Sequence, residues 1–333
     1  MISQPISDFA NWRGGHLEQC GCGMRVLITG GTGHLGIGVC RAFVKDGFNV
    51  RLLCHKKQGK SLGSDLEIVW GDITQPDSVK KAVNGVDAVV HMAGLVQPLT
   101  EAKPELATRV NVEGTRTVVN SIKERVERVP FVFTSSAAVY GPCPGATELL
   151  HPDRTPCNPT SVYAESKLRS ENLIKESGIG YVILRLTSVP DPRRKISDFK
   201  TQMFTIPLKN RVEFCHADDL ALAILNAVKN FDMVKGRTLM IGGGPSQQMH
   251  YEDMLRAVLG TFGLPLPPQH RFAQEPFPLH WYDTTESQKL LRYQNKTLDD
   301  YSRDLATQFP APLVALMCRF IGPVFGRLIV RLM

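Results

Sequence analysis

Tyr163 and Lys167 are four residues apart, so a helix would carry both side chains on one face. A free tyrosine has a pKa of about 10 and is a poor base near neutral pH. An ammonium group held beside it would stabilise the phenolate and lower that pKa, so the pair could pass a proton to or from a hydroxyl. The spacing therefore predicts an acid/base pair.

A serine that could serve the same chemistry ends the apolar run 131–136. At the end of a strand, Ser136 would border the same pocket and hydrogen-bond a substrate oxygen as charge develops on it. Ser135 is the alternative if the register differs by one residue. Tyr-x-x-x-Lys and Ser-Ser also occur without function, so these assignments need support from the rest of the chain.

That support comes from a glycine-rich turn near the start of the chain. The apolar run 26–28 is followed closely by Gly30, and Gly33 and Gly36 follow at equal spacing before a helical pattern begins. Such a strand-to-helix turn lets backbone N–H groups approach a pyrophosphate. We therefore predict that the turn, with His34 and Leu35 inside it, binds a dinucleotide cofactor.

The next apolar run, 49–54, predicts the strand whose end faces the adenosine ribose. An acidic residue there would select NAD, but the sequence has Cys54 or His55, followed by Lys56 and Lys57. Two cations and no acid favour NADP over NAD, although a solvated lysine pair at the start of a loop has the same sequence.

Further apolar runs alternate with helical patterns along the first part of the chain. This alternation predicts an α/β fold with a doubly wound parallel sheet of the Rossmann type and a small C-terminal substrate lobe. We divide the chain into a flexible tail (1–23), a nucleotide-binding core (24–185), a substrate lobe (186–310) whose segment 209–243 returns to the core, and a terminal helix (311–333).

Six motifs occur in an order that resembles the extended short-chain dehydrogenase/reductase superfamily. The resemblance is to its NAD-dependent epimerase/dehydratase and 3β-hydroxysteroid dehydrogenase-like branch, over about residues 24–305. The motifs are Gly30-x-x-Gly33-x-x-Gly36, Gly71-Asp72-Ile73, His91-x-Ala93-Gly94, Asn111-Val-x-Gly-Thr115, Ser135-Ser136-Ala-Ala-Val-Tyr-Gly141 and Tyr163-Ala-Glu-Ser-Lys167.

The resemblance implies a role for each matching residue of the catalytic site. Tyr163 would be the acid/base, Lys167 would bind the nicotinamide ribose and tune Tyr163, and Ser136 would orient the substrate. Asn111 would support Lys167 through water. The family often dimerises through the two helices that would contain Asn111 and Tyr163, so a homodimer is expected.

The same resemblance assigns the remaining cofactor contacts. Asp72 and Ile73 match the pair that holds adenine, and Ala93 and Gly94 match the loop beside the pyrophosphate and ribose. His91 fits a core position in a strand better than a catalytic one.

Two departures from the family pattern bear on the reaction. The segment 187–213 is short and lacks Tyr-Gly-Pro, unlike sugar-nucleotide epimerases, and Ala137 and Ala138 replace the acids of 4,6-dehydratases. We therefore predict an NAD(P)-dependent oxidoreductase that moves hydride at a secondary alcohol or ketone carbon of a small molecule. A sugar or sugar-nucleotide epimerase, and a non-catalytic NADPH sensor or scaffold, are the alternatives.

Composition excludes some other classes of protein. The net charge of +7 is spread along the chain without an aromatic-interleaved basic stripe, which argues against nucleic acid as a partner. Eight cysteines show no metal-binding spacing, so no metal is expected and a reducing, cytoplasmic compartment is favoured. Residues 1–23 lack the apolar core of a secretory signal, which leaves a disordered tail or a start at Met24.

The stretch 312–333 differs from the rest because it is mainly apolar. As a helix it would gather Arg319, Arg327 and Arg331 within about a third of its circumference. A basic amphipathic helix can lie on the inner face of an anionic membrane or dock on a partner. A terminal helix packed on its own domain is the alternative.

Overall fold

The computed structural model describes residues 23–55, 66–125, 128–143, 145–190 and 203–307. Their centre is a parallel sheet of seven strands in the order β3-β2-β1-β4-β5-β6-β8, which confirms the predicted doubly wound α/β fold. The strands are β1 (Arg25–Thr29), β2 (Asn49–Cys54), β3 (Leu66–Trp70), β4 (Ala88–His91), β5 (Phe131–Ser136), β6 (Tyr181–Leu186) and β8 (Thr238–Ile241).

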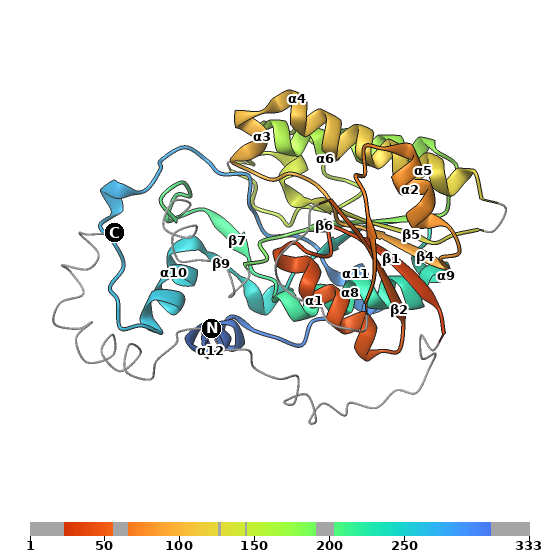
Figure 1. Ribbon diagram of the computed structural model, residues 1–333. Coiled ribbons are helices and arrows are strands. Elements are labelled where there is room, and N and C mark those ends of the chain that lie inside the picture. Colours follow the sequence, from red (N-terminus) through yellow and green to blue (C-terminus); the bar gives the residue numbers. More distant parts are fainter. Residues whose placement is uncertain (1–22, 56–65, 126–127, 144, 191–202, 308–333) are drawn as a thin grey trace.

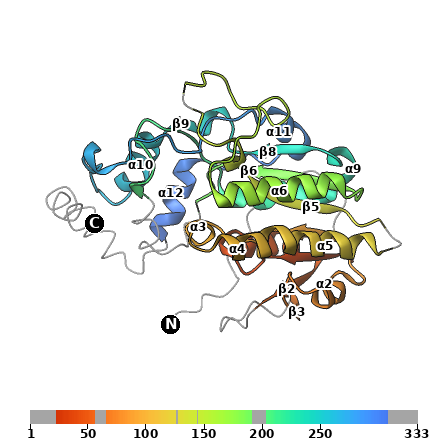
Figure 2. The same ribbon diagram turned by 90° about the horizontal axis from the view of Figure 1, so that it is seen from above.

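Helices cover both faces of this sheet, as Figures 1 and 2 show. One face carries α1 (His34–Lys45), α8 (Ala217–Lys229), α9 (Phe231–Val234) and α11 (Thr285–Leu291), and the other carries α2 (Pro76–Val83), α5 (Gly114–Lys123) and α6 (Val162–Glu176). Val26 and Ile28 of β1 lie in the first apolar core and Leu27 in the second, all without exposed surface. Burial on both faces explains why the strands are continuous apolar runs.

Short helical segments line the edge of the sheet where the strands end. They are α3 (Leu99–Ala102), α4 (Pro104–Ala107), the π-helical turn η1 (Thr108–Glu113) and the 3₁₀ turn η2 (Ala137–Tyr140). The predicted helix around Asn111 is thus a π-helical turn that runs directly into α5. Such turns are often found at functional sites.

A smaller lobe lies beside the sheet (Figure 1). In it β7 (Arg211–Glu213) pairs antiparallel with β9 (Gln248–His250), next to η3 (Pro245–Gln247), α10 (Tyr251–Gly260), η4 (Gln269–Arg271) and α12 (Leu298–Thr307). An apolar cluster that includes Phe214, Leu255 and Tyr301 forms its core. Helix α11 (Thr285–Leu291) follows the lobe segments in the chain but packs against α8 and against β8 of the sheet.

Several sequence predictions fall outside the described residues. These are the flexible tail up to residue 22, the cofactor-binding assignment of Lys56 with its neighbour Lys57, and the basic helix at 312–333. Among the residues that the structure describes, no helix is long and apolar enough to cross a bilayer. The division into core and lobe stays a prediction.

Candidate active site

The glycine turn after β1 has a backbone that larger residues would disrupt. Gly30 has a φ of +74°, and a Cβ there would lie 2.6 Å from the Ala93 backbone nitrogen. A Cβ on Gly36 would overlap the Gly30 carbonyl oxygen, whereas one on Gly33 would meet only that oxygen, at 3.2 Å. A side chain therefore does not fit at Gly30 or Gly36, where the backbone of the turn lies against other backbone atoms, whereas space remains beside Gly33.

The first turn of α1 points into this open side. Gly33 is the N-cap of α1 and, as a glycine, has no side chain that could cap the first backbone N–H groups of the helix. His34 and Leu35 form the first turn, His34 being exposed and Leu35 half-buried. Uncapped amides beside a glycine that leaves space fit the pyrophosphate of a dinucleotide.

Gly31 is a further glycine that the sequence interpretation missed. A Cβ at this position would come within 2.6 Å of Leu52 Cδ2 and 2.8 Å of Cys40 Sγ. The glycine therefore allows α1 to pack closely on β2. The adjacent pair Gly30-Gly31 was the signal that could have revealed it.

The residues predicted to hold the adenosine half lie together at the ends of β2 and β3. His55 Nδ1 is 3.2 Å from Asp72 Oδ2. Asp72 Oδ1 accepts hydrogen bonds from the backbone N–H and the hydroxyl of Thr74, at 2.8 and 2.9 Å. Ile73 is buried against Gly114, where a Cβ would be 2.7 Å from its Cδ1, so Ile73 is foremost a core contact.

Ser136 and Tyr163 meet at the end of β5 and the start of α6. Burial raises the pKa of Tyr163 above its ordinary value, and the neighbouring Ser136 hydroxyl lowers it by less. Ser136 Oγ also accepts from the Ala138 N–H at 3.2 Å. In this structure burial outweighs the effect that lowers the pKa of Tyr163, and the tuning of Tyr163 by Lys167 stays a prediction.

Lys167 lies one turn further along α6 and is only 6% exposed. Its Nζ donates to the Thr134 carbonyl at 2.8 Å and lies 4.9 Å from the centre of the Phe133 ring. Burial lowers the pKa of Lys167 to about 8, against the opposing effect of the Glu171 carboxylate. A lysine with this pKa changes charge close to physiological pH.

Asn111 joins the η1 turn to the catalytic helix and to the loop after β4. Its Oδ1 accepts from Leu95 N–H at 2.7 Å, and its Nδ2 donates to the Leu95 carbonyl and to Ser166 Oγ at 3.0 and 2.9 Å. A Cβ on Gly94 would be 3.2 Å from Asn111 Oδ1 and 3.7 Å from Lys167 Nζ. Gly94, next to half-buried Ala93, therefore lies beside both Asn111 and Lys167, and the water link between the two stays a prediction.

Two residues that belong to the predicted motifs, Ser135 and His91, make contacts inside the protein core. Ser135 donates to Glu171 Oε1 at 2.6 Å inside the core, so of the two serines Ser136 faces Tyr163. His91 has no exposed surface and lies between Thr29 and Thr115, with ring nitrogens 2.6 and 3.0 Å from their hydroxyls. Burial lowers the pKa of His91 to about 3, so it is neutral and suited to the core.

Glu101 contacts the catalytic helix but was not found from the sequence. Its Oε1 accepts a hydrogen bond from the backbone N–H of Tyr163 at 3.2 Å, although the two residues are 62 positions apart. Gln97 Nε2 donates to the same oxygen at 3.2 Å. Glu101 therefore satisfies a free amide at the start of α6 and links the loop after β4 to Tyr163.

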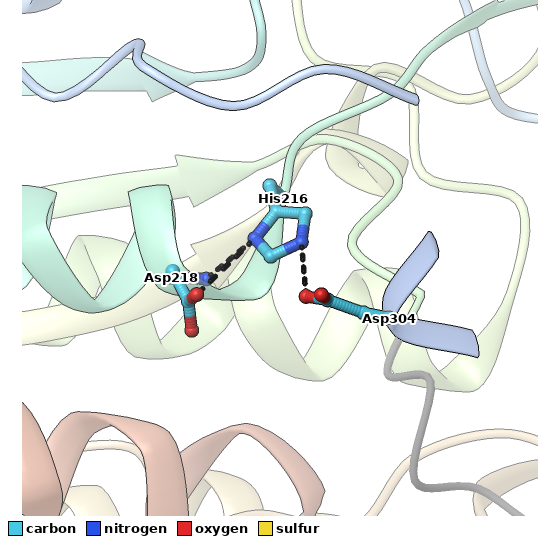
Figure 3. A group of neighbouring side chains, drawn as sticks. All are labelled: His216, Asp218 and Asp304. Atoms are coloured by element: carbon cyan, nitrogen blue, oxygen red, sulfur yellow. Dashed lines mark hydrogen bonds and ion pairs between the residues drawn. The ribbon is translucent and has the colours of Figure 1, made fainter. Parts of the chain in front are cut away.

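A histidine and two aspartates in the lobe resemble a metal site, as Figure 3 shows. His216 Nε2 lies 3.3 Å from Asp304 Oδ2, and its Nδ1 accepts the Asp218 backbone N–H at 3.1 Å as the N-cap of α8. With Nδ1 accepting, Nε2 carries the proton of the neutral ring and cannot also bind a cation. This hydrogen-bonding pattern argues against a metal and makes His216 a link between α8 and α12.

Comparison with known proteins agrees with this geometry. The model of the NAD dependent epimerase/dehydratase family matches residues 26–242, from β1 to the end of β8. The chain belongs to this family. The match confirms the resemblance inferred from the six motifs. The description of the family names it as NAD-dependent.

Among curated members of the epimerase/dehydratase family, the D-erythronate dehydrogenase of Cupriavidus necator is 30% identical over 212 residues, 58% of this chain and 64% of that protein. The UDP-glucose 4-epimerase of Azospirillum brasilense is 30% identical over 182 residues, 52% of this chain and 51% of that protein. The chain thus spans between half and two thirds of the length of these relatives.

Solved structures extend the similarity in fold. The UDP-glucuronic acid 4-epimerase of Bacillus cereus, in complex with UDP-glucuronic acid and NAD, superposes with a TM-score of 0.71 over 86% of this chain and 99% of that one. The sequence identity is 22%. This structural similarity supports the epimerase/dehydratase fold and does not identify a substrate.

Proposed function

We propose that this protein is an NAD(P)-dependent oxidoreductase that transfers hydride to or from a secondary alcohol or ketone carbon of a small molecule. The observation that carries the proposal is the placement of Ser136, at the end of β5, beside Tyr163 at the start of α6, with Lys167 one turn further along that helix. A sensor or scaffold without activity would not need this arrangement.

Each residue has a role that follows from its position. Tyr163 passes a proton to or from the substrate oxygen, and Ser136 hydrogen-bonds the same oxygen as its charge changes. Lys167, with a pKa of about 8, is charged below that pH and would bind the ribose of the cofactor. The bound nicotinamide cofactor supplies or accepts the hydride.

The departures from epimerases and dehydratases support net oxidation or reduction. Ala137 is buried and Ala138 is half-buried in η2, directly after Ser136. Neither can act as the acid or base of water elimination. Epimerisation is the second candidate, because the relatives include UDP-glucose 4-epimerases.

The deciding experiment compares the wild-type protein with Tyr163→Phe in a screen of secondary alcohols and ketones. We expect the variant to keep cofactor binding and to lose 10²- to 10⁴-fold in kcat, the usual contribution of a positioned acid/base. Tyr181→Phe is a matched control, because Tyr181 is a half-buried tyrosine at the start of β6.

The outcomes separate the candidates. Full turnover by Tyr163→Phe would contradict the proposed mechanism. Bound cofactor that resists dialysis, together with interconversion of epimers without net change in absorbance at 340 nm, would favour an epimerase. Cofactor binding with no turnover of any compound in the wild type would favour a sensor.

We further propose that NADP is preferred over NAD. The residue after β2 is His55 and not an acid, and Lys56 and Lys57 follow it in the sequence. Titration of NADPH and NADH into wild-type and Lys56→Ala/Lys57→Ala protein tests this preference. Tighter NADH binding by the wild type would refute it.

A homodimer through the outer faces of α5 and α6 is a further proposal. A surface cavity of about 420 Å³ lies between these helices, lined by residues such as Val119 and Leu173 together with Arg116 and Arg169. Side chains of a second copy could fill it. Light scattering of wild-type and Leu173→Glu protein tests this, and an unchanged mass would contradict it.

For residues 312–333 the sequence offers three possibilities, which are contact with an anionic membrane, docking on a partner and packing on the chain's own domain. The cytoplasmic, membrane-peripheral location follows from the first of them. Sedimentation of the full chain with anionic vesicles tests the first. Binding that is lost on changing Arg319, Arg327 and Arg331 to Glu would support contact with a membrane surface, and no binding would favour docking on a partner or packing on the chain's own domain.

A further inference from the structure

The backbone of Tyr163 is held at both of its polar groups by contacts that begin in the loop after β4. Its N–H donates to Glu101 Oε1 at 3.2 Å. Its carbonyl accepts a hydrogen bond from Ser166 Oγ at 2.7 Å, and Ser166 Oγ in turn accepts one from Asn111 Nδ2 at 2.9 Å. Asn111 is bonded through its amide to both backbone groups of Leu95. The loop after β4 therefore reaches the first turn of α6 by two separate routes.

The Glu101 carboxylate is itself fixed by neighbours on its own segment. Its Oε2 accepts a hydrogen bond from the hydroxyl of fully buried Thr100, and its Oε1 accepts one from Gln97 Nε2 at 3.2 Å. Burial raises the pKa of Glu101, but its hydrogen bonds together lower it by more, so the group stays ionised and acts only as an acceptor. Helix α3, to which Glu101 belongs, also packs against α6. The carboxylate is thus a fixed acceptor beside the Tyr163 amide.

The next amide of the same turn is capped in a different way. Ser161, the N-cap of α6, accepts the Ala164 N–H through its Oγ at 3.2 Å. These two residues are three positions apart, whereas Glu101 and Tyr163 are 62 apart. A local cap stabilises the helix end without fixing it relative to the rest of the protein. The bond from Glu101 does fix it, because its acceptor comes from another part of the chain.

We infer that Glu101 is a positioning residue for proton transfer by Tyr163, because its carboxylate fixes the first turn of α6 against the loop after β4 and so sets where the Tyr163 hydroxyl lies. This inference rests on the role of Tyr163 in the proposed function. The same loop contains Ala93 and Gly94, which the family resemblance assigns to the cofactor, so one loop aligns the acid/base with the cofactor. A displacement of about 1 Å at a reacting group can cost on the order of 100-fold in rate.

The experiment compares the wild type with three variants that each change one contact at this helix end. Glu101→Ala removes the acceptor of the Tyr163 amide. Glu101→Gln keeps a carboxamide oxygen for that amide and removes the charge. Ser161→Ala removes one capping hydrogen bond from the same turn and leaves the Tyr163 amide bonded. It is therefore the matched control for a loss of helix stability alone.

The first measurement needs no substrate and follows the ionisation of Tyr163. The ultraviolet absorbance of the phenolate is recorded against pH for each protein and for its counterpart that also carries Tyr163→Phe, and the difference isolates one of the seven tyrosines. Because burial raises the pKa of Tyr163, a hydroxyl that leaves its place should titrate nearer to about 10. We expect this shift in Glu101→Ala, whereas Glu101→Gln and Ser161→Ala should titrate like the wild type.

The second measurement uses a secondary alcohol or ketone that the wild type turns over, with the dissociation constant of NADH measured by nicotinamide fluorescence. We expect Glu101→Ala to lose about tenfold in kcat, while its KM and its NADH dissociation constant stay within about twofold of the wild type. Glu101→Gln and Ser161→Ala should keep at least about half of the wild-type kcat.

Three results would overturn the inference. They are equal losses of kcat in Glu101→Ala and Ser161→Ala, which would make Glu101 only a helix cap, a loss in Glu101→Gln as large as that in Glu101→Ala, and a Tyr163 in Glu101→Ala that titrates as in the wild type. Failure of the proposed function would appear separately, as full turnover by Tyr163→Phe or as no turnover by the wild type. The phenolate titration tests the placement of Tyr163 by Glu101 in either case.

Discussion

Replacing Lys167, the lysine of the proposed catalytic site, by an apolar side chain should make the protein more stable while abolishing the proposed activity. Lys167 is 6% exposed, and burial lowers its pKa from 10.5 to about 8. That difference corresponds to about 3 kcal/mol of unfavourable burial of the charged form. The variant also loses the hydrogen bond from Lys167 Nζ to the Thr134 carbonyl, which lowers its stability by about 1 kcal/mol. The free energy of unfolding of Lys167→Met should therefore exceed that of the wild type by about 2 kcal/mol near pH 7.

The sign of the pH dependence follows from the protons bound by each state. Between pH 8 and 10.5 the unfolded chain keeps the Lys167 proton and the folded chain releases it, so this group makes wild-type stability rise with pH. Lys167→Met lacks that rise. The difference in the free energy of unfolding between Lys167→Met and the wild type is therefore largest below pH 8, and it shrinks as the pH approaches 10.5.

Urea denaturation of both proteins at pH 7.0 and 9.5, followed by circular dichroism, measures the difference. Lys167→Arg is the matched control, because it keeps a buried charge that no accessible pH removes. A variant Lys167→Met that is less stable than the wild type at pH 7.0, or a difference that does not shrink at pH 9.5, would refute the reasoning.

Three further variants test the fold and the site. Gly36→Ala should weaken NADH binding at least tenfold by forcing the Gly30 carbonyl out of the turn; Gly260→Ala, where a Cβ meets nothing within 4 Å, should bind normally. Glu171→Gln should cost about 3–5 kcal/mol in urea denaturation, because it leaves the Arg185 guanidinium buried without its carboxylate; a cost below 1 kcal/mol would contradict this. Glu101→Ala should lower stability by about 1 kcal/mol by leaving an amide at the start of α6 without its acceptor, and an unchanged melting temperature would show that water replaces the carboxylate.

Much of the fold could be predicted from local patterns. Strands buried on both faces are mostly apolar, so runs such as residues 26–28 indicate a parallel sheet without knowledge of their partner strands. The glycine spacing in the first turn reflects a backbone that allows no Cβ at Gly30 and Gly36. These are constraints within a few residues, and they are visible in the sequence.

The electrostatics of the site could not be predicted in this way. The choice between Ser135 and Ser136 depends on which face of β5 meets α6, and the structure turns Ser135 toward Glu171. The raised pKa of Tyr163 depends on how much chain covers it. Glu101 reaches the Tyr163 amide across 62 residues, a contact that exists only once the chain has folded.

One face of α6 shows how stability and chemistry are connected in this protein. Tyr163, Lys167 and Glu171 follow at intervals of four, so the helix presents an acid/base, its lysine and a buried carboxylate in a row. Glu171 binds Arg185 of β6 through both oxygens, at 2.7 and 3.0 Å, and it also raises the pKa of Lys167 against the effect of burial. Without that carboxylate the Lys167 pKa would fall further below 8, and less of the ammonium form would remain at neutral pH. The ion pair that fastens α6 to β6 therefore also keeps the catalytic lysine charged.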